Sequence, residues 1–125
     1  MSLRVVLADD SVTMQGRILD ALKGIVGVEI VARCENGKEA LDAIRALQPD
    51  IAILDNIMPH LTGAEVVDAM RAENLPTKAM LCTSVAQGCV VDKYTVLIKP
   101  FNKTQMTQKI WDLFGTVDFT EATNA

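Results

Sequence analysis

Short aliphatic runs alternate with helical patterns along most of the chain. Five apolar runs have the length and the Val, Ile and Leu content of strands buried on both faces, at residues 3–8, 28–34, 51–55, 78–82 and 95–99. Between successive runs up to the fourth, and again after the fifth, apolar residues recur at the spacing of a helix face. Strands separated by single helices form βα units, so this order predicts a parallel α/β sheet with helices on both faces.

Capping residues mark where the predicted helices begin. Ser11 is a candidate N-cap for the first helix, and Thr62 with Glu65 forms the capping box of the third. Asn102 and Gln105 give the last helix a similar start. In open parallel sheets the functional site lies beyond the carboxyl ends of the strands. The function is therefore predicted from the residues that follow each strand.

Carboxylates, hydroxyls and one ammonium group stand at these strand ends. They are Asp9 and Asp10 after the first strand, Asp55 after the third, Thr83 and Ser84 after the fourth, and Lys99 after the fifth. Three carboxylates on one rim would raise each other's pKa unless a cation joined them. Oxygen ligands without His or Cys indicate a hard ion such as Mg²⁺. The single histidine, His60, is interpreted as an exposed loop residue.

These strand ends, in this order, resemble the receiver domain of two-component response regulators, the CheY-like family. The motifs that carry the resemblance are Asp9-Asp10, Asp55 followed by Met58-Pro59 and Gly63, Thr83, and Lys99-Pro100-Phe101. The match extends from about residue 3 to residue 114. It implies a flavodoxin-like five-stranded sheet of order 2-1-3-4-5 and a cis bond between Lys99 and Pro100.

The resemblance implies phosphoryl transfer to an aspartate. The carboxylate of Asp55 would attack the phosphorus of a phosphohistidine donor and give an aspartyl phosphate. Asp9 and Asp10 would hold Mg²⁺, with Asp55 and the backbone carbonyl of Ile57 completing the protein ligands. The expected phosphodonor is a histidine kinase or a histidine phosphotransfer protein, and the output target is a protein that the sequence does not identify.

Thr83 and Lys99 are predicted to contact the phosphoryl group, one through its hydroxyl and the other through its positive charge. The family's aromatic switch position on the fifth strand is Val96 here, and Tyr94 is displaced from it by two residues. Trp111 either covers the sheet or offers an exposed aromatic to a partner. The candidate output surface comprises Ser84, Tyr94, Val96 and Trp111.

The connection between the fourth and fifth strands is short for the family. Fifteen residues separate Thr83 from Lys99, and after the strand and its connections about seven remain for a helix. Gly88 and several β-branched valines also disfavour a short helix. We expect the usual fourth helix to be shortened or absent, with residues 85–93 forming a loop or single turn that phosphorylation orders.

Composition limits the remaining possibilities. A chain of 125 residues that is 50% hydrophobic fits one domain, predicted over 1–115 with a polar tail at 116–125. The net charge of -4, without a Lys/Arg cluster, argues against nucleic acid and membrane surfaces as partners. Cys34, Cys82 and Cys89 lack metal-binding spacing and are expected to be reduced. We expect a cytoplasmic protein, because no run is long enough to span a membrane.

The predicted function is therefore a phosphoacceptor receiver domain, and not an enzyme beyond self-catalysed phosphotransfer and slow autodephosphorylation. In the family that the chain resembles, the positions two residues beyond the acceptor aspartate and the threonine influence the access of the hydrolytic water. They are the apolar Ile57 and Val85 here, so the resemblance implies slow hydrolysis. One alternative is a receiver fragment of a larger regulator or hybrid kinase. Another is a metal-dependent phosphohydrolase on a related α/β fold. Such an enzyme needs an acid/base carboxylate two residues beyond its nucleophile, where Asp55 has Ile57 and Asp9 has Ser11. A receiver without phosphorylation, used as a scaffold, is disfavoured by the complete set of acidic residues, Thr83 and Lys99.

Overall fold

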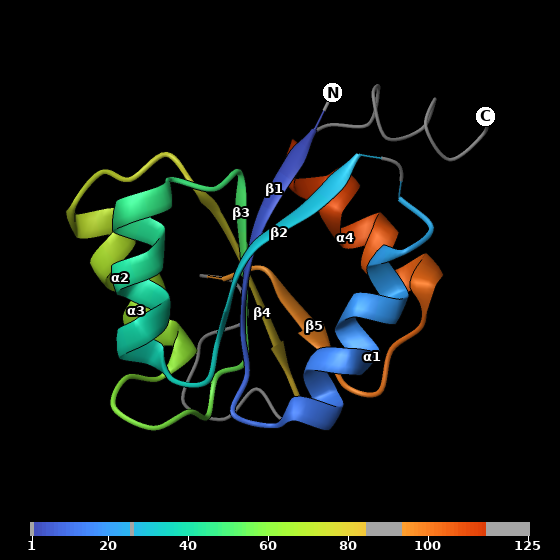
Figure 1. Cartoon of the computed structure of the whole chain (residues 1–125), viewed down its shortest axis with the longest axis horizontal. Helices are drawn as coiled ribbons and strands as arrows, with labels where there is room; N and C mark the ends of the chain where they lie inside the picture. The colour runs from blue at the N-terminus through green and yellow to red at the C-terminus, as the bar shows by residue number, and fades with distance from the viewer. Residues whose placement is uncertain (1, 26, 85–93, 115–125) are drawn as a thin grey trace.

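A computed structural model describes residues 2–25, 27–84 and 94–114, which form a parallel sheet between two layers of helices (Figure 1). The strands are β1 (Leu3–Ala8), β2 (Val28–Cys34), β3 (Ile51–Leu54), β4 (Lys78–Thr83) and β5 (Val96–Ile98). Adjacent strands are parallel and their order is β2-β1-β3-β4-β5. The predicted fold class and strand order are confirmed. The third and fifth strands are shorter than predicted, and β4 continues through Thr83.

The helices of the described residues cover both faces of this sheet. They are α1 (Val12–Leu22), α2 (Gly37–Leu47), α3 (Gly63–Ala72) and α4 (Lys103–Phe114). Helices α1 and α4 lie side by side on one face, and α2 and α3 lie on the other (Figure 1). The arrangement leaves the carboxyl ends of all five strands at one rim of the molecule.

Side-chain caps start the helices at the predicted places. The Ser11 hydroxyl accepts from the backbone N–H of Met14 at 3.2 Å. Thr62 and Glu65 form the reciprocal capping box of α3, and the last helix has the same exchange between the Asn102 and Gln105 side chains and backbone N–H groups. Each cap satisfies a donor that the helix leaves unpaired, which is typically worth about 1 kcal/mol.

Each face of the sheet has its own hydrophobic core. Alternate residues of one strand point to opposite faces, so Leu7 packs with α1 and α4 while Val6 packs with α2 and α3. In the same way Ile53 and Leu54 of β3 belong to different cores, and both are fully buried. A fully buried aliphatic side chain contributes roughly 1.5–3 kcal/mol. The two cores hold the strand ends in fixed positions.

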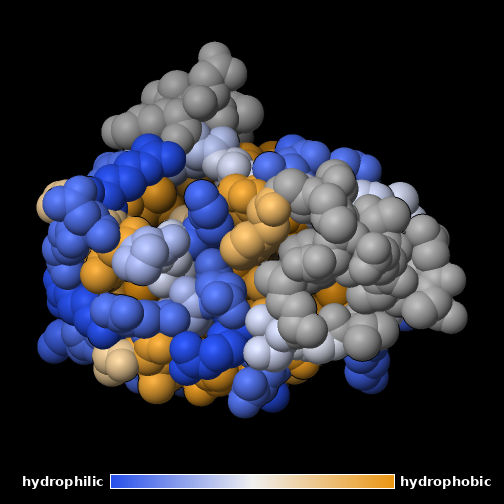
Figure 2. Space-filling model, turned by 90° about the horizontal axis from the view of Figure 1, so that it is seen from above, coloured by the Kyte–Doolittle hydropathy of each residue, from blue (hydrophilic) through white to orange (hydrophobic). Residues whose placement is uncertain are grey.

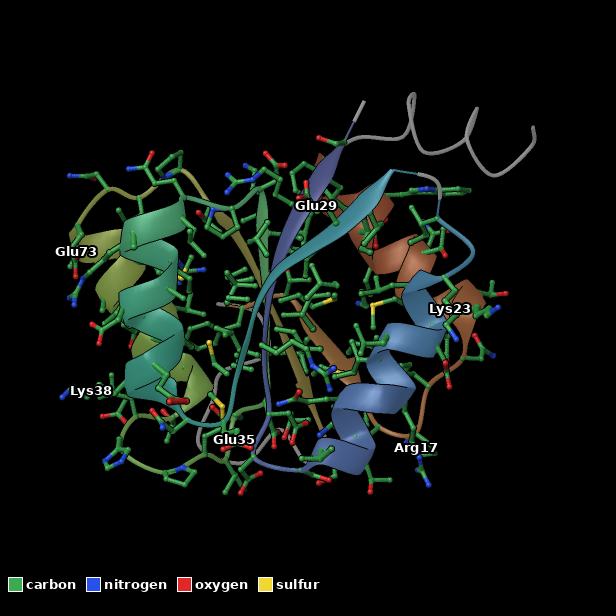
Figure 3. The ribbon with its side chains drawn as sticks, viewed as in Figure 1. Arg17, Lys23, Glu29, Glu35, Lys38 and Glu73 are labelled. Atoms are coloured by element: carbon green, nitrogen blue, oxygen red, sulfur yellow. The ribbon has the colours of Figure 1, made fainter. Side chains whose placement is uncertain are left out.

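The edge strand β2 contains an irregularity. Val5 of β1 pairs with Ile30 and Val6 pairs with Ala32, so Val31 has no partner on β1. In Figure 3, Glu29 near the start of β2 and Glu35 just beyond its end lie at opposite ends of the sheet, and the labelled charged side chains lie at the periphery. The extra residue gives β2 the local bend and twist of a β-bulge.

The described cysteines are consistent with the predicted reduced state. Cys34 and Cys82 are buried and have free thiols. Burial raises the pKa of Cys34 to about 11 and the pKa of Cys82 to about 12. A raised pKa suppresses the reactive thiolate, so both side chains serve as small apolar residues of the core.

Several predictions concern residues outside the described ranges. The shortened helix or loop at 85–93, Cys89 and the polar tail at 116–125 all belong to this group, and they stay predictions. Within the ranges that are described, no helix combines the length and the hydropathy needed to cross a membrane.

Candidate functional site

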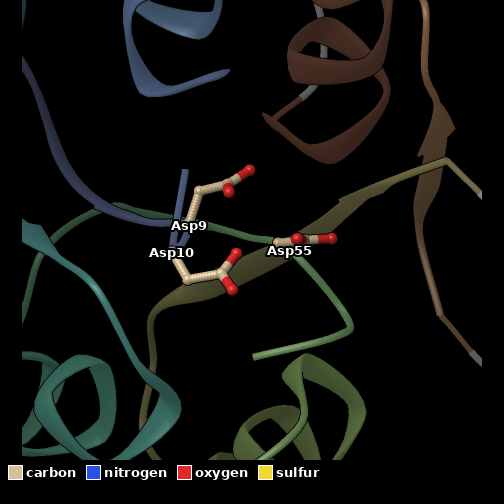
Figure 4. A group of neighbouring side chains, drawn as sticks. All are labelled: Asp9, Asp10 and Asp55. Atoms are coloured by element: carbon tan, nitrogen blue, oxygen red, sulfur yellow. The ribbon is translucent and has the colours of Figure 1, made fainter. Parts of the chain in front are cut away.

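Three carboxylates converge at the carboxyl rim of the sheet. Asp9 and Asp10 follow β1, and Asp55 follows the adjacent strand β3. One oxygen from each carboxylate lies within 4.8 Å of the others (Figure 4). Asp9 is 1% exposed and Asp55 is 9% exposed, whereas Asp10 is open to solvent. The sequence prediction that these acids meet at one place is confirmed.

Lys99 provides the positive charge of the site. Its Nζ lies 2.9 Å from Oδ2 of Asp9 and 3.7 Å from Oδ2 of Asp55. The backbone N–H of Lys99 donates to the carbonyl of Thr83 at 2.9 Å, which fixes the end of β5 beside the end of β4. The Lys99–Pro100 peptide bond is cis, as the resemblance implied. The ammonium group is thus held among the carboxylates by the sheet itself.

The pKa of Asp55 is raised above its ordinary value, chiefly because the carboxylate is buried. The charge of Lys99 opposes this shift, the charge of Asp9 adds to it, and hydrogen bonds from the Asn56 backbone and the Thr83 side chain lower the pKa again. Thr83 is itself buried, so its hydroxyl faces Asp55 away from solvent. Thr83 thus lies within hydrogen-bond reach of the central aspartate, and its contact with a phosphoryl group stays a prediction.

The donor set fits a hard divalent cation. The ligand atoms are carboxylate oxygens, one of the three acids is open to solvent, and the single ammonium group leaves negative charge uncompensated. Mg²⁺ prefers one or two carboxylates together with water and phosphate oxygens. A cation here would offset the burial and repulsion that raise the pKa of Asp55. The predicted carbonyl ligand of Ile57 lies in the loop after Asp55, where the Ile57 side chain is 60% exposed.

Two more buried side chains support the site, and the sequence prediction did not single out the first of them, Asn56. The Asn56 side-chain oxygen accepts from the backbone N–H of Ala64 at 3.0 Å, and its carbonyl accepts from Gly63 at 2.8 Å. Together these bonds fix the start of α3 against the residue after Asp55. Gln15, the second, is 3% exposed and links α1 to the ends of β1 and β2. A polar residue on the apolar stripe of α1, three and seven residues before Ile18 and Leu22, is the signal that identifies it.

A glycine allows the close packing of α3 against the acceptor strand. A Cβ at Gly63 would collide with the carbonyl oxygen of Asp55 and would lie 2.7 Å from a methyl group of Leu81. His60, in the loop before this helix, is exposed, as predicted.

The candidate output residues differ in exposure and in the core that they contact. Val96 is buried, and Tyr94 packs in the core on the side of α2 and α3. The Tyr94 hydroxyl donates to Asp68 of α3 at 2.8 Å, and the Arg71 guanidinium lies 5.2 Å from the ring centre. Trp111 packs against the core on the other face of the sheet. Of the candidate residues, Ser84 is the one that is exposed at the carboxyl rim. Tyr94 and Trp111 thus pack against opposite faces of the sheet, and the output surface stays a prediction.

Comparisons with known proteins agree with this geometry. The model of the response regulator receiver domain family matches residues 5–111, which is most of the chain. The chain belongs to the response regulator receiver domain family. As a receiver domain it is a phosphoacceptor signalling module rather than an enzyme that turns over separate substrates. The phosphohydrolase alternative is rejected, and the acidic triad is typical of the Mg²⁺ site of receiver domains.

Individual relatives of this receiver domain differ in length. The chemotaxis protein CheY of Listeria monocytogenes is 30% identical over 114 residues, which cover 86% of this chain and 95% of that protein. A protein-glutamate methylesterase/protein-glutamine glutaminase of Desulfotalea psychrophila is 31% identical over 116 residues, 86% of this chain but 32% of that protein. The chain thus spans about a third of this second relative. The receiver domain of the putative response regulator NarL from Mycobacterium tuberculosis has a TM-score of 0.80 and 30% identity, covering 89% of this chain and 94% of that one.

Proposed function

We propose that Asp55 is the phosphoacceptor of this receiver domain, that Asp9 and Asp10 hold Mg²⁺ together with Asp55, and that Thr83 and Lys99 contact the phosphoryl group. The observation that carries the proposal is the convergence of the three carboxylates within 4.8 Å around the Lys99 ammonium group. Asp55 has the central position, because it lies at the end of β3 and is the acid to which the Thr83 hydroxyl bonds.

The residues of the site act on the charges of the transfer. An ionised oxygen of Asp55 forms a bond to phosphorus while the bond between phosphorus and the donor's imidazole nitrogen breaks, and the leaving imidazole takes up a proton. When bound, Mg²⁺ supplies positive charge to the phosphoryl oxygens. Lys99 Nζ is 2.9 Å from Asp9 and 3.7 Å from Asp55, so it can contact an oxygen of a phosphoryl group on Asp55. The Thr83 hydroxyl can move its hydrogen bond from the carboxylate to that phosphate.

The partners follow from the chemistry of the donor and of the output. A histidine kinase or a histidine phosphotransfer protein supplies the phosphoryl group, and a protein target reads the phosphorylated state. The exposed apolar side chain of Ile57, two residues beyond Asp55, supports slow hydrolysis because it offers no polar group to orient an attacking water. The Ile57 carbonyl completes the metal ligands. The receiver unit covers 1–115 in the cytoplasm, alone or as part of a longer regulator.

Intact-mass measurement tests the assignment of the acceptor. Wild-type protein is incubated with Mg²⁺ and a small phosphodonor such as phosphoramidate, and its mass should rise by one phosphoryl group. Asp55→Asn should show no gain. Asp50→Asn is the matched control, since Asp50 precedes the same strand at its opposite end and should leave labelling intact. Undiminished labelling of Asp55→Asn would overturn the assignment.

The ligand roles are tested separately from the acceptor role. Asp10→Asn should weaken Mg²⁺ binding at least about tenfold, since even the loss of a partner one step removed from a metal ligand typically costs about 10- to 100-fold. Binding is measured as the rise in the free energy of unfolding with Mg²⁺ concentration. An Asp10→Asn variant that binds Mg²⁺ as tightly as the wild type would contradict the metal site.

A further inference from the structure

Gln15 of α1 joins three segments beside the acidic site. Its side-chain Nε2 donates to the carbonyl of Asp9 at 2.8 Å and to the carbonyl of Cys34 at 3.0 Å. Its Oε1 accepts from Nε of Arg33 at 3.0 Å. The residue is 3% exposed, so these bonds are made away from water. One amide therefore ties the first turn of α1 to the ends of β1 and β2.

The orientation of this amide is set by its partners. A guanidinium group has donors and no acceptor, so the oxygen of the Gln15 amide must face Arg33. The two backbone carbonyls can only accept, so the nitrogen must face Asp9 and Cys34. A flipped amide would place like groups against each other at all three contacts. The group is thus held in a single orientation.

The hydrogen bond from Gln15 to the Asp9 carbonyl lies just beyond the last hydrogen bonds of the sheet. The last ladder bonds at this rim run from Asp55 N–H to the carbonyl of Ala8 at 2.9 Å and from Asp9 N–H to the carbonyl of Cys34 at 3.1 Å. The next carbonyl, that of Asp9, lies beyond the strand and accepts from Gln15 instead. This carbonyl belongs to the peptide plane that joins Asp9 to Asp10. Because a peptide unit is planar, fixing its oxygen also fixes the direction in which the chain enters Asp10.

Asp10 depends on its backbone for its direction. Asp9 is held through its side chain, whose Oδ1 accepts from Ser11 N–H and whose Oδ2 accepts from Lys99. In the part of the chain that the structure describes, the Asp10 carboxylate has no hydrogen bond and no ion pair, although it points toward Asp55 (Figure 4). A carboxylate without side-chain partners is directed by the backbone that carries it.

We propose that Gln15 is a positioning residue of the metal site: its amide holds the Asp9–Asp10 peptide so that the Asp10 carboxylate faces Asp55. The inference rests on the proposed function, because it takes Asp10 to be a Mg²⁺ ligand. Replacing the amide should lower Mg²⁺ affinity even though Gln15 does not touch the ion. Partners one step removed from a metal ligand typically contribute about 10- to 100-fold to affinity.

The experiment compares Mg²⁺ affinity with stability in the full chain. Gln15→Met keeps the length of the side chain and removes its hydrogen bonds, and Gln15→Asn keeps the amide but withdraws it by one methylene group. Urea unfolding over a series of Mg²⁺ concentrations at constant ionic strength gives the metal-free stability and, from its increase with Mg²⁺, the dissociation constant. Gln15→Asn keeps the comparison possible should Gln15→Met not fold.

Thr77→Val is the matched control. Thr77 is also buried and its hydroxyl donates to a backbone carbonyl, that of Pro49, at 2.7 Å, but it lies at the opposite rim of the sheet. We expect both Gln15 variants and the control to lose stability. The Gln15 variants should in addition raise the Mg²⁺ dissociation constant about tenfold, while Thr77→Val leaves it unchanged.

The outcomes separate the two proposals. Gln15 variants that bind Mg²⁺ with wild-type affinity would overturn the positioning role while the proposed metal site stands. An equal loss of affinity in Thr77→Val would overturn it too, since affinity would then follow global stability. A wild-type protein whose stability does not respond to Mg²⁺ would instead overturn the metal site of the proposed function, and the inference with it.

Discussion

At the amino rim of the sheet, polar groups are paired and peripheral, whereas at the carboxyl rim carboxylates crowd around one ammonium group. The carboxylate of Asp50 accepts from Arg4 N–H at 2.8 Å, and its own backbone bonds to Arg4 and Lys78. Figure 2 views the molecule from this amino rim, where hydrophilic side chains surround hydrophobic ones in the part that is coloured. Five of the six buried polar residues in the described part of the chain lie at the other rim.

This difference shows that the groups at the carboxyl rim serve the chemistry of the site although they lower the stability of the folded protein. The two rims belong to the same strands and border the same cores, so apolar packing does not distinguish them. At the amino rim a polar group closes a strand by satisfying the backbone. At the carboxyl rim burial raises the pKa of Asp55, which means that the metal-free protein holds a carboxylate in an unfavourable place. We therefore expect substitutions at the carboxyl rim to affect the function of the site, and substitutions at the amino rim to affect stability alone.

The largest expected effect is steric. Gly63→Ala places a Cβ against the carbonyl oxygen of Asp55 and should cost about 3 kcal/mol of unfolding free energy, because backbone cannot move aside as a flexible side chain can. Gly16→Ala is the control, since nothing lies within 4 Å of its Cβ and alanine favours the helix by about 1 kcal/mol. Urea unfolding measures both. Equal stability of the two variants would show that the carboxyl rim is less tightly packed than described.

Lys99→Met should slow phosphorylation about 100-fold, which corresponds to roughly 2.7 kcal/mol. The Lys99 side chain is 11% exposed and its ammonium group lies beside two carboxylates, so its loss removes charge that the incoming phosphoryl group needs. Lys78→Met, at the exposed start of β4, removes the same charge from the amino rim. Labelling rates with a small phosphodonor should fall for the first variant alone. A similar fall in both would mean that net charge, rather than position, governs the rate.

Asp50→Ala should cost about 2 kcal/mol in stability, because it removes a charged acceptor from the N–H of Arg4. The extent of phosphorylation and the Mg²⁺ dissociation constant should both stay at wild-type values. Urea unfolding and intact-mass labelling of the same preparation check the two halves of this prediction. Lost labelling in the folded variant would break the distinction between the rims.

The smallest expected effect is a gain in the free energy of unfolding rather than a loss. Asp55→Asn should stabilise the metal-free protein at pH 7 by about 1 kcal/mol, a usual gain when a strained functional residue is replaced. Because burial raises the pKa of Asp55, the folded state is penalised while the carboxylate is ionised and the penalty disappears as pH falls through that pKa. The gain should therefore shrink as the solution is acidified toward the ordinary carboxyl range. Unfolding free energies measured from pH 7 downward would contradict the assignment if the gain grew instead.

Much of the fold follows from local pattern. Strands β1 and β2 have the predicted bounds, because their aliphatic runs end at Asp9 and at the polar residues after Cys34. The ends of β3 and β5 were predicted one residue too far, since hydropathy does not reveal where the ladder to a neighbouring strand stops. The convergence of Asp9, Asp55 and Lys99 could be predicted because parallel strands end at one rim.

The hydrogen-bond partners of the supporting residues could not be predicted in the same way. Gln15 and Asn56 bond to backbone groups that lie six to nineteen positions away in the chain, and no spacing rule points to such partners. The packing of Tyr94 and Trp111 against opposite faces of the sheet could not be predicted, because spacing along the chain does not show which side of the sheet each residue faces. The bond from Tyr94 to Asp68 joins the start of β5 to α3, and this tertiary contact has no local signature.

The unpaired Val31 in β2 bears on how copies of this chain could associate. A strand at the margin of a sheet offers free N–H and C=O groups to any extended chain, and bulges and charges are the usual defence. A straight strand from a second copy could pair with β2 up to Ile30. It would lose the hydrogen-bond register from Ala32 onward, because the bulge shifts the register there. Exposed Glu29 and Arg33 add charge along the same margin. Edge-to-edge pairing along β2 is thereby disfavoured.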